Sequence, residues 1–121
     1  MEKKHKILLV EDDPDIRTMM TFILRDDYDL VLCEDGRCGI DKAVKERPDL
    51  ILLDIYMPGI SGLEVCKAVR DNPEISSTPI IMLTAGAFKD EVTKGYAIGA
   101  DDYVFKPFEP EELIERIEKL L

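Results

Sequence analysis

Several residue types are missing or scarce in this 121-residue sequence, and each gap narrows the class of protein. Glutamine and tryptophan are absent and Asn72 is the only asparagine, a scarcity of amides that would suit a thermophile. The three cysteines, Cys33, Cys38 and Cys66, are odd in number and lack metal-ligand or CxxC spacing, so we expect buried or free thiols in a reducing compartment. No apolar run is long enough for a signal peptide or a membrane span, which favours a cytoplasmic protein.

Basic residues are outnumbered, with 16 Lys and Arg against 26 Asp and Glu and a net charge of −10. Binding to phosphate backbones or anionic lipid needs a basic surface, so we expect neither direct nucleic-acid binding nor membrane binding. The negative charge is compatible with a site that attracts cations. The length and a hydrophobic content of 45% predict one domain over residues 1–121 with a sizeable core.

Short apolar runs alternate with amphipathic segments along the whole chain. The runs are Ile7–Val10, Leu30–Cys33, Leu50–Leu53, Pro79–Leu83 and Tyr103–Phe105. The first, third and fourth are apolar throughout, which is typical of strands covered on both faces in a parallel sheet. Helical spacing of apolar residues follows each run, and Asp13-Pro14 and Glu109-Pro110 are helix-start signals.

Helices are also expected at 36–46, at 89–98 and around the spaced apolar residues Leu63, Cys66 and Val69. Five strand–helix units predict an α/β fold with a parallel sheet and helices on both faces. In such sheets the ligand site lies beyond the carboxyl ends of the strands. The residues at those ends are therefore the candidates for function.

Polar residues follow the strands in a pattern that suits phosphoryl chemistry. Glu11-Asp12-Asp13 follows the first strand, Asp54 the third, Thr84 the fourth and Lys106-Pro107 the fifth. Clustered carboxylates repel one another unless a cation lies among them, and oxygen ligands with open water positions favour Mg²⁺. A metal, a lysine and a hydroxyl together would stabilise a phosphoryl group, with Asp54 as its acceptor.

Four stretches, which carry five motifs in order, extend this pattern over nearly the whole chain: ILLVEDDPDIR, LILLDIYMPGISG, PIIMLTA and DDYVFKPF. The last stretch carries two of the motifs, an aromatic residue and a Lys-Pro pair. By these motifs the sequence resembles the receiver domain of bacterial two-component response regulators. The resemblance implies a doubly wound, CheY-like and flavodoxin-like fold, with five strands in the order 2-1-3-4-5 and five helices.

The resemblance also implies a role for each matching residue. Asp54 would be the phosphoacceptor, and Mg²⁺ would be held by Glu11, Asp12, Asp54 and the backbone carbonyl of Tyr56. Thr84 and Lys106 would bind the phosphoryl group, Tyr103 would switch between exposed and buried positions, and the bond before Pro107 would be cis. The acidic pair is Glu-Asp instead of the common Asp-Asp, so Asp12 is expected to be the more direct ligand, with Glu11 acting through water. In the family, the positions of Tyr56 and Gly86 influence how fast the phosphoryl group is lost by hydrolysis.

Plainer interpretations stand beside these roles. Asp54 could start an Asx turn, Glu11 and Asp12 could form a solvated acidic loop, and Asp13 is better explained as a helix cap. Tyr103 could be core packing alone. The charged face of the last helix, which includes Glu111, Glu112, Glu115, Arg116, Glu118 and Lys119, is most simply a solvated face, although it could bind a partner.

Our functional prediction is a phosphorylation switch that assists its own chemistry and is not a conventional enzyme. Its phosphoryl donor would be a sensor histidine kinase or a histidine phosphotransfer protein, and its effector is unknown. It would be a monomer or a phosphorylation-dependent homodimer, either a stand-alone receiver or the excised domain of a transcription regulator. A phosphatase of the haloacid dehalogenase type would need a second aspartate where Tyr56 stands. An interaction module that is never phosphorylated would not need the full set of side chains.

Overall fold

The protein alternates strands and helices from end to end in this computed structural model, which describes residues 4–85 and 89–121. The strands are β1 (Lys6–Val10), β2 (Asp29–Cys33), β3 (Leu50–Asp54), β4 (Ile80–Thr84) and β5 (Asp102–Phe105). The helices are α1 (Pro14–Leu24), α2 (Gly36–Glu46), α3 (Gly62–Asp71), α4 (Lys89–Ile98) and α5 (Pro110–Leu120).

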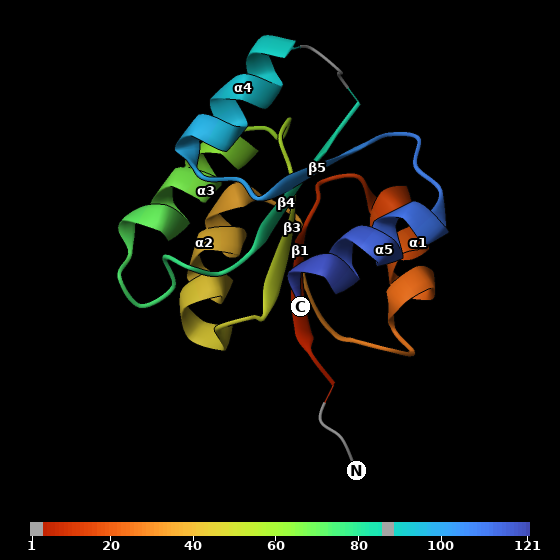
Figure 1. Cartoon of the computed structure of the whole chain (residues 1–121). Helices are drawn as coiled ribbons and strands as arrows, with labels where there is room; N and C mark the ends of the chain where they lie inside the picture. Colours follow the sequence, from red (N-terminus) through yellow and green to blue (C-terminus); the bar gives the residue numbers. More distant parts are fainter. Residues whose placement is uncertain (1–3, 86–88) are drawn as a thin grey trace.

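All strand pairs are parallel, and the sheet order is β2-β1-β3-β4-β5, so the predicted fold class and strand order are confirmed. Helices α1 and α5 cover one face of the sheet, and α2, α3 and α4 cover the other (Figure 1). The three strands predicted to be buried on both faces, β1, β3 and β4, are the three central ones. Uninterrupted apolar sequence therefore marks strands that have helices above and below them.

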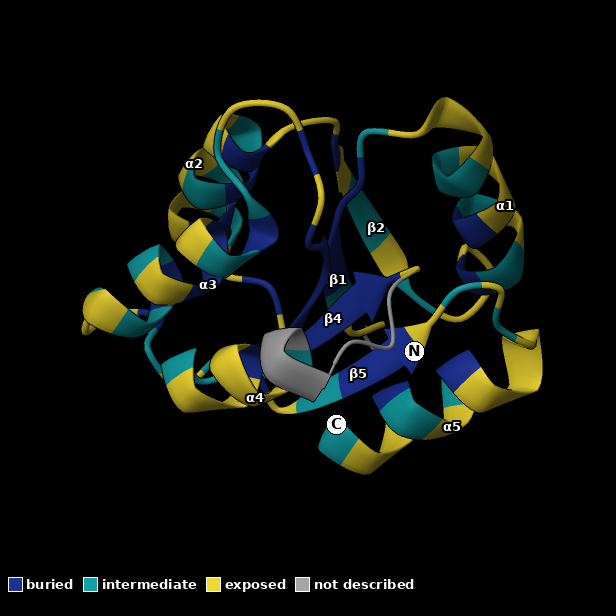
Figure 2. Ribbon diagram, turned by 90° about the horizontal axis from the view of Figure 1, so that it is seen from above, coloured by how far each residue is buried: buried dark blue, intermediate teal, exposed yellow. Residues whose placement is uncertain are grey.

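Two cores lie on either side of the sheet because successive strand residues point to opposite faces. Leu8 and Val10 face α2 and α3, whereas Ile7 and Leu9 face α1 and α5. Figure 2 shows the same arrangement, with buried central strands and helices whose outer faces are exposed. No helix in the described ranges is long and apolar enough to cross a membrane.

Local sequence signals explain where the helices begin. Asp13 caps α1 by accepting a hydrogen bond from the Asp15 N–H, and Pro14 takes the first helical position, as predicted. Pro110 begins α5 in the same way, but Glu109 makes no side-chain cap. The helices predicted over 36–46 and 89–98 have those bounds in the structure.

The sheet extends further than the apolar runs at two functional positions. β3 includes Asp54 and β4 includes Thr84, because the parallel ladder continues to the pairs Asp54–Leu83 and Thr84–Phe105. β4 begins at Ile80 instead of Pro79, since proline has no N–H for the ladder. Its carbonyl still accepts a hydrogen bond from the Ile51 N–H at 2.9 Å. Asp54 and Thr84 are thus held by the sheet itself.

The prediction of buried or free thiols is wrong for two of the three cysteines, which are not thiols in the structure. Cys33 at the end of β2 and Cys38 in the first turn of α2 form a disulfide, and only Cys66 is a buried free thiol. An odd cysteine count and a spacing of five residues gave no sign of this pair, because the contact depends on how the strand turns into the helix.

Candidate functional site

Three carboxylates gather at the carboxyl edge of the sheet. Glu11 and Asp12 follow β1, and Asp54 is the last residue of the neighbouring strand β3. One carboxylate oxygen from each lies within 4.8 Å of the others. Parallel strands bring their carboxyl ends to one edge, so residues more than forty positions apart in the sequence meet here, as the sequence predicted.

The three acids differ in burial. Glu11 is completely buried and Asp54 is only 4% exposed, whereas the Asp12 side chain reaches solvent. Glu11 is held from several directions: its Oε2 accepts a hydrogen bond from the Asp13 N–H at 3.2 Å, and its carbonyl accepts one from Arg17 at 2.8 Å. Glu11 thus lies on the inner side of the cluster and Asp12 on the solvent side.

Lys106 supplies the positive charge within the cluster. Its Nζ lies 2.7 Å from Glu11 Oε1 and 3.5 Å from Asp54 Oδ1, and its side chain is 17% exposed. The Lys106 N–H donates to the Thr84 carbonyl at 2.8 Å, which ties the segment after β5 to the end of β4. The Lys106–Pro107 peptide bond is cis. One ammonium group is thus shared between two buried carboxylates.

The pKa of Asp54 is raised from 3.8 to about 7. Burial is the largest cause, followed by a hydrogen bond with Glu11 and the negative charge of Glu11, while Lys106 acts in the opposite direction. Ionisation of Asp54 therefore costs free energy in the folded protein as long as no cation lies among the three acids. A cation placed among the three acids would remove that cost, and an all-oxygen donor set fits a hard divalent ion.

Thr84 and Tyr103 lie on the strands beside the cluster. Thr84 is 1% exposed at the end of β4, one residue beyond the partner of Asp54 in the β3–β4 ladder. Tyr103 on β5 is 3% exposed, and its ring lies 5.1 Å from that of Tyr96 and 6.2 Å from that of Phe105. Tyr56, two residues beyond Asp54, is 52% exposed, and Gly86 lies outside the described residues.

A glycine in α4 makes room for Tyr103, and sequence patterns gave no sign of it. A Cβ placed on Gly95 would overlap the Tyr103 hydroxyl. We expect Gly95→Ala to push the ring out of its buried position and to destabilise the protein by about 1–3 kcal/mol, despite the better helix propensity of alanine. Nitration by tetranitromethane, located by mass spectrometry, should then modify Tyr103, which is protected in the unchanged protein.

The Gly95→Ala/Tyr103→Phe double variant is the control, because it removes the hydroxyl that the new methyl group would meet. We expect it to recover most of the lost stability relative to Tyr103→Phe alone. An alanine variant with unchanged stability and a protected Tyr103 would show that α4 can shift to accommodate the methyl group.

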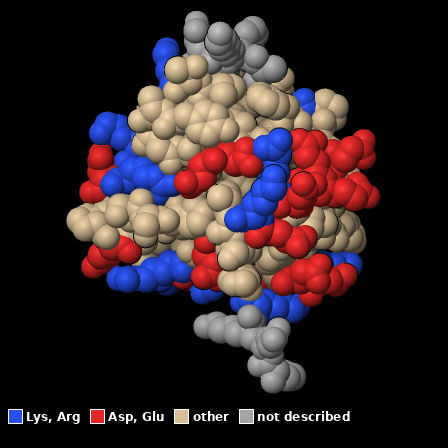
Figure 3. All heavy atoms as spheres, viewed as in Figure 1, with Lys and Arg blue, Asp and Glu red and all other residues tan. Residues whose placement is uncertain are grey.

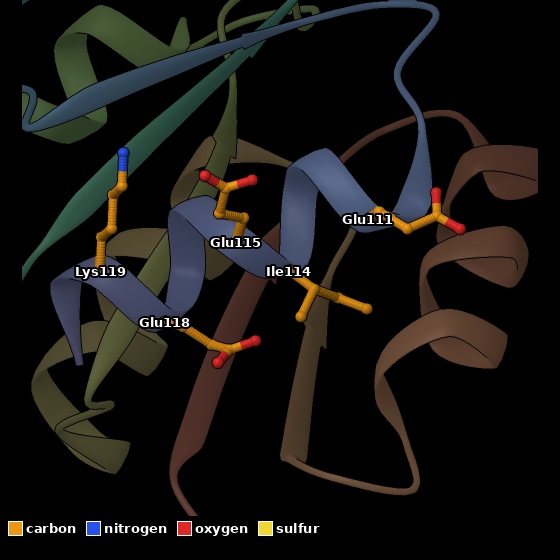
Figure 4. Close-up of a pocket in the computed structure, with 5 residues that line it drawn as sticks. All are labelled: Glu111, Ile114, Glu115, Glu118 and Lys119. Carbon is orange, nitrogen blue, oxygen red and sulfur yellow. The ribbon is translucent and has the colours of Figure 1, made fainter.

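Two surface hollows differ in their relation to the cluster. One, of about 520 Å³, lies on α5 and is lined by Ile114 and four charged residues, Glu111, Glu115, Glu118 and Lys119 (Figure 4). It shares no residue with the acidic cluster. The other is an apolar groove lined by Ile16, Met19, Ala85, Lys106, Pro107 and Phe108. Lys106 belongs to both this groove and the cluster, so the groove opens beside the candidate site.

Comparison with known proteins gives consistent matches. Residues 7–118 match the family model described as the response regulator receiver domain. The DNA-binding response regulator MtrA of Mycolicibacterium smegmatis is 42% identical over 115 residues, which are 94% of this chain and 49% of that protein. The chain thus spans about half the length of the curated relatives it matches.

Solved structures agree with the sequence matches. The chemotaxis protein CheY4 of Vibrio cholerae superposes with a TM-score of 0.93 at 38% identity, covering 98% of this chain and all of that one. The receiver domain of the sensor histidine kinase PA1611 from Pseudomonas aeruginosa superposes with a TM-score of 0.90 at 32% identity, covering 98% of each chain. That structure is described as having a magnesium ion coordinated in its active-site cleft.

Proposed function

The chain belongs to the response regulator receiver domain family of two-component signalling systems, and we propose that Asp54 is its phosphoacceptor. The single observation that supports this assignment best is the position of Asp54: a nearly buried carboxylate with a lysine ammonium 3.5 Å away and two further acids beside it. A carboxylate that served only as a turn former would need neither the partly buried lysine nor the acidic partners.

We further propose that the cluster holds Mg²⁺, with Asp12 and Asp54 as direct ligands and the Tyr56 carbonyl and Glu11 as the remaining protein groups. The mutual proximity of the three carboxylates and the raised pKa of Asp54 both fit a site that needs a divalent cation. When bound, the ion would neutralise charge on the phosphoryl oxygens. A magnesium ion in the cleft of the similar PA1611 receiver domain supports the choice of metal.

The transfer needs one bond made and one broken. A carboxylate oxygen of Asp54 attacks the phosphorus of a phosphohistidine, the phosphorus–nitrogen bond breaks, and the imidazole leaves with that electron pair. Lys106 stabilises the negative charge on the phosphoryl oxygens, since its Nζ already lies between Glu11 and Asp54. Water later attacks the phosphorus of the acyl phosphate, the bond between phosphorus and the Asp54 oxygen breaks, and inorganic phosphate leaves the restored carboxylate. The protein thus assists both its phosphorylation and its dephosphorylation without being a conventional enzyme.

The phosphoryl group would change the surface through Thr84 and Tyr103. Its oxygens would draw the Thr84 hydroxyl inward, which would alter the space available to Tyr103. An uncharged patch lies over α4 and β5 beside an acidic area over α5 (Figure 3), with Tyr96 and Phe105 among the exposed apolar residues. We propose this face as the partner surface, used either by an effector or in a phosphorylation-dependent homodimer.

The donor would be a sensor histidine kinase or a histidine phosphotransfer protein. The apolar groove beside Lys106 supports this assignment, because it offers a docking surface next to the reactive carboxylate, and Met19 in its lining is 43% exposed. MtrA is described as a DNA-binding response regulator, but the net charge of −10 on this chain argues against DNA contact by this domain itself. We place the domain in the cytoplasm, where such kinases deliver their phosphoryl groups.

Acetyl phosphate with Mg²⁺ is the direct test. We expect intact-mass spectrometry to show a gain of one phosphoryl group that disappears when EDTA is added before the donor. Hydroxylamine should remove the group, since it cleaves acyl phosphates and spares phosphoserine and phosphothreonine. Continuous turnover of a phosphate monoester would instead indicate a phosphatase, and no mass gain from acetyl phosphate or phosphoramidate would indicate an unphosphorylated interaction module.

Magnesium affinity should depend on pH because a proton and the metal compete for Asp54. With the Asp54 pKa at about 7, the carboxylate is ionised above that pH and protonated below it. We therefore expect Mg²⁺ binding, measured by calorimetry, to weaken by up to about tenfold per pH unit as the pH falls from 7 to 5. In Asp54→Asn the affinity should be lower and nearly constant between pH 8 and 6. An affinity that stays constant in the unchanged protein would contradict the raised pKa.

A further inference from the structure

A disulfide at the edge of the sheet has no part in the phosphoryl chemistry. It joins Cys33, the last residue of β2, to Cys38 in the first turn of α2. Cys33 is 2% exposed, whereas Cys38 is only partly buried. The bond therefore joins a core residue to one that is partly exposed, so Cys38 is the side from which a small thiolate could approach.

The first turn of α2 has its capping hydrogen bonds independently of this disulfide. Asp35 caps the helix: its Oδ1 accepts a hydrogen bond from the Cys38 N–H at 2.8 Å, and its carbonyl accepts one from the Gly39 N–H at 3.1 Å. α1 begins with an equivalent cap by Asp13 and α3 with one by Ser61, and neither has a disulfide. The bond is thus an addition to a helix start that already has its hydrogen bonds.

The bond nevertheless joins two segments that touch the phosphoacceptor region. The Cys33 carbonyl accepts the Glu11 N–H at 3.0 Å. A Cβ on Gly36 would lie 2.7 Å from the Ile60 carbonyl oxygen, so the start of α2 packs closely against the loop that follows β3. A covalent link between Cys33 and Cys38 therefore restrains the contacts behind Glu11 and beside the β3–α3 loop.

We propose that Cys33 and Cys38 form a reversible redox site whose reactants are low-molecular-weight thiols and disulfides. For oxidation, one cysteine thiolate attacks a small disulfide, forming a mixed disulfide and releasing one thiol. The second cysteine thiolate then attacks the protein sulfur and releases the second thiol. The two protein thiols lose two electrons and two protons, and the small disulfide gains them. Reduction by two small thiols is the reverse.

Glutathione titration of the full chain tests reversibility without reference to phosphorylation. The protein is equilibrated at a series of reduced-to-oxidised glutathione ratios, quenched in acid, unfolded and alkylated. We expect the number of alkylated cysteines to fall from three to one as the ratio becomes more oxidising, and to return to three in native protein treated with dithiothreitol. In the Cys66→Ala variant, the number of alkylated cysteines should fall from two to none over the same range of ratios. Three alkylated cysteines at every ratio, or a bond that native protein does not release, would overturn the proposal.

Hydrogen exchange tests what the bond restrains. Reduction should raise the amide exchange rates of Cys38 and Gly39 by about tenfold or more, because the first turn of α2 then opens more often. The matched amides of α1, Asp15 and Arg17, should not change. Reduction should also lower the Tm by about 5–10 °C, as expected for a short disulfide loop. Unchanged exchange in α2 together with an unchanged Tm would contradict the restraining role.

Discussion

Replacement of Asp54 by asparagine is expected to abolish phosphoryl uptake and, in the same molecule, to stabilise the metal-free fold at pH 8. The amide is nearly the same size as the carboxylate but has no negative oxygen with which to attack phosphorus. Under conditions in which the unchanged protein gains one phosphoryl group, the variant should gain none. Mass spectrometry after incubation with acetyl phosphate and Mg²⁺ is the measurement.

The gain in stability follows from the raised pKa of Asp54. Ionising this carboxylate costs more in the folded protein, where its pKa is about 7, than in the unfolded chain, where it is near 3.8. The folded state holds the proton more tightly, so this group's contribution to stability is present at low pH and is lost as the pH rises towards 7 and beyond. Asparagine avoids that cost, and we expect the variant to be about 2–4 kcal/mol more stable at pH 8 in EDTA.

Urea unfolding at two pH values separates this effect from a general change in stability. The difference between Asp54→Asn and the unchanged protein should shrink at pH 5, where Asp54 is protonated in the folded state. Asp13→Asn is the matched control, because asparagine also caps helices and Asp13 is exposed. It should keep its phosphoryl uptake and show little change in stability. An Asp54→Asn protein that is less stable at pH 8 would contradict the electrostatic account of the cluster.

The sequence predicted the fold and the meeting of the acids because both depend on backbone regularities. Apolar runs without alternation identified β1, β3 and β4 as strands covered on both faces, and these are the central strands of the sheet. The parallel arrangement brings their carboxyl ends to one edge. Once the sheet was predicted, the proximity of Asp12, Asp54 and Lys106 followed without knowledge of any side-chain conformation. Strand pairing then fixed Asp54 as the last residue of β3.

Side-chain partners could not be predicted in this way. Lys106 was expected to offset the charge of the acidic cluster, but the spacing did not show that Glu11 would be fully buried and hydrogen-bonded to Lys106, 95 positions away. Gly95 provides the space for the Tyr103 hydroxyl, which the spacing of residues in the predicted helix at 89–98 did not indicate. The Cys33–Cys38 disulfide likewise depends on one turn of chain between β2 and α2. Each of these contacts is set by packing in three dimensions, which residue spacing does not report.

Replacement of Lys106 by methionine is expected to destabilise the metal-free protein strongly and to slow phosphoryl uptake. Methionine keeps most of the length of the side chain but leaves Glu11, which is completely buried, without the ammonium 2.7 Å from its Oε1. Removing the partner of a buried carboxylate leaves an uncompensated charge, and we expect the free energy of unfolding to fall by about 2–5 kcal/mol at pH 8. Loss of the positive charge should slow uptake from acetyl phosphate by roughly 100-fold.

Lys67→Met is the matched control for this prediction. Lys67 also has a close carboxylate partner, Asp71 Oδ2 at 2.8 Å, but both side chains are more than 60% exposed. Solvent screens such pairs, so this variant should unfold like the unchanged protein. Adding Glu11→Gln to Lys106→Met should recover part of the stability, since the unpaired buried charge is then removed. If Lys106→Met were no less stable than Lys67→Met, the ammonium would not be neutralising Glu11 and Asp54, and its assignment to the phosphoryl site would lose its structural support.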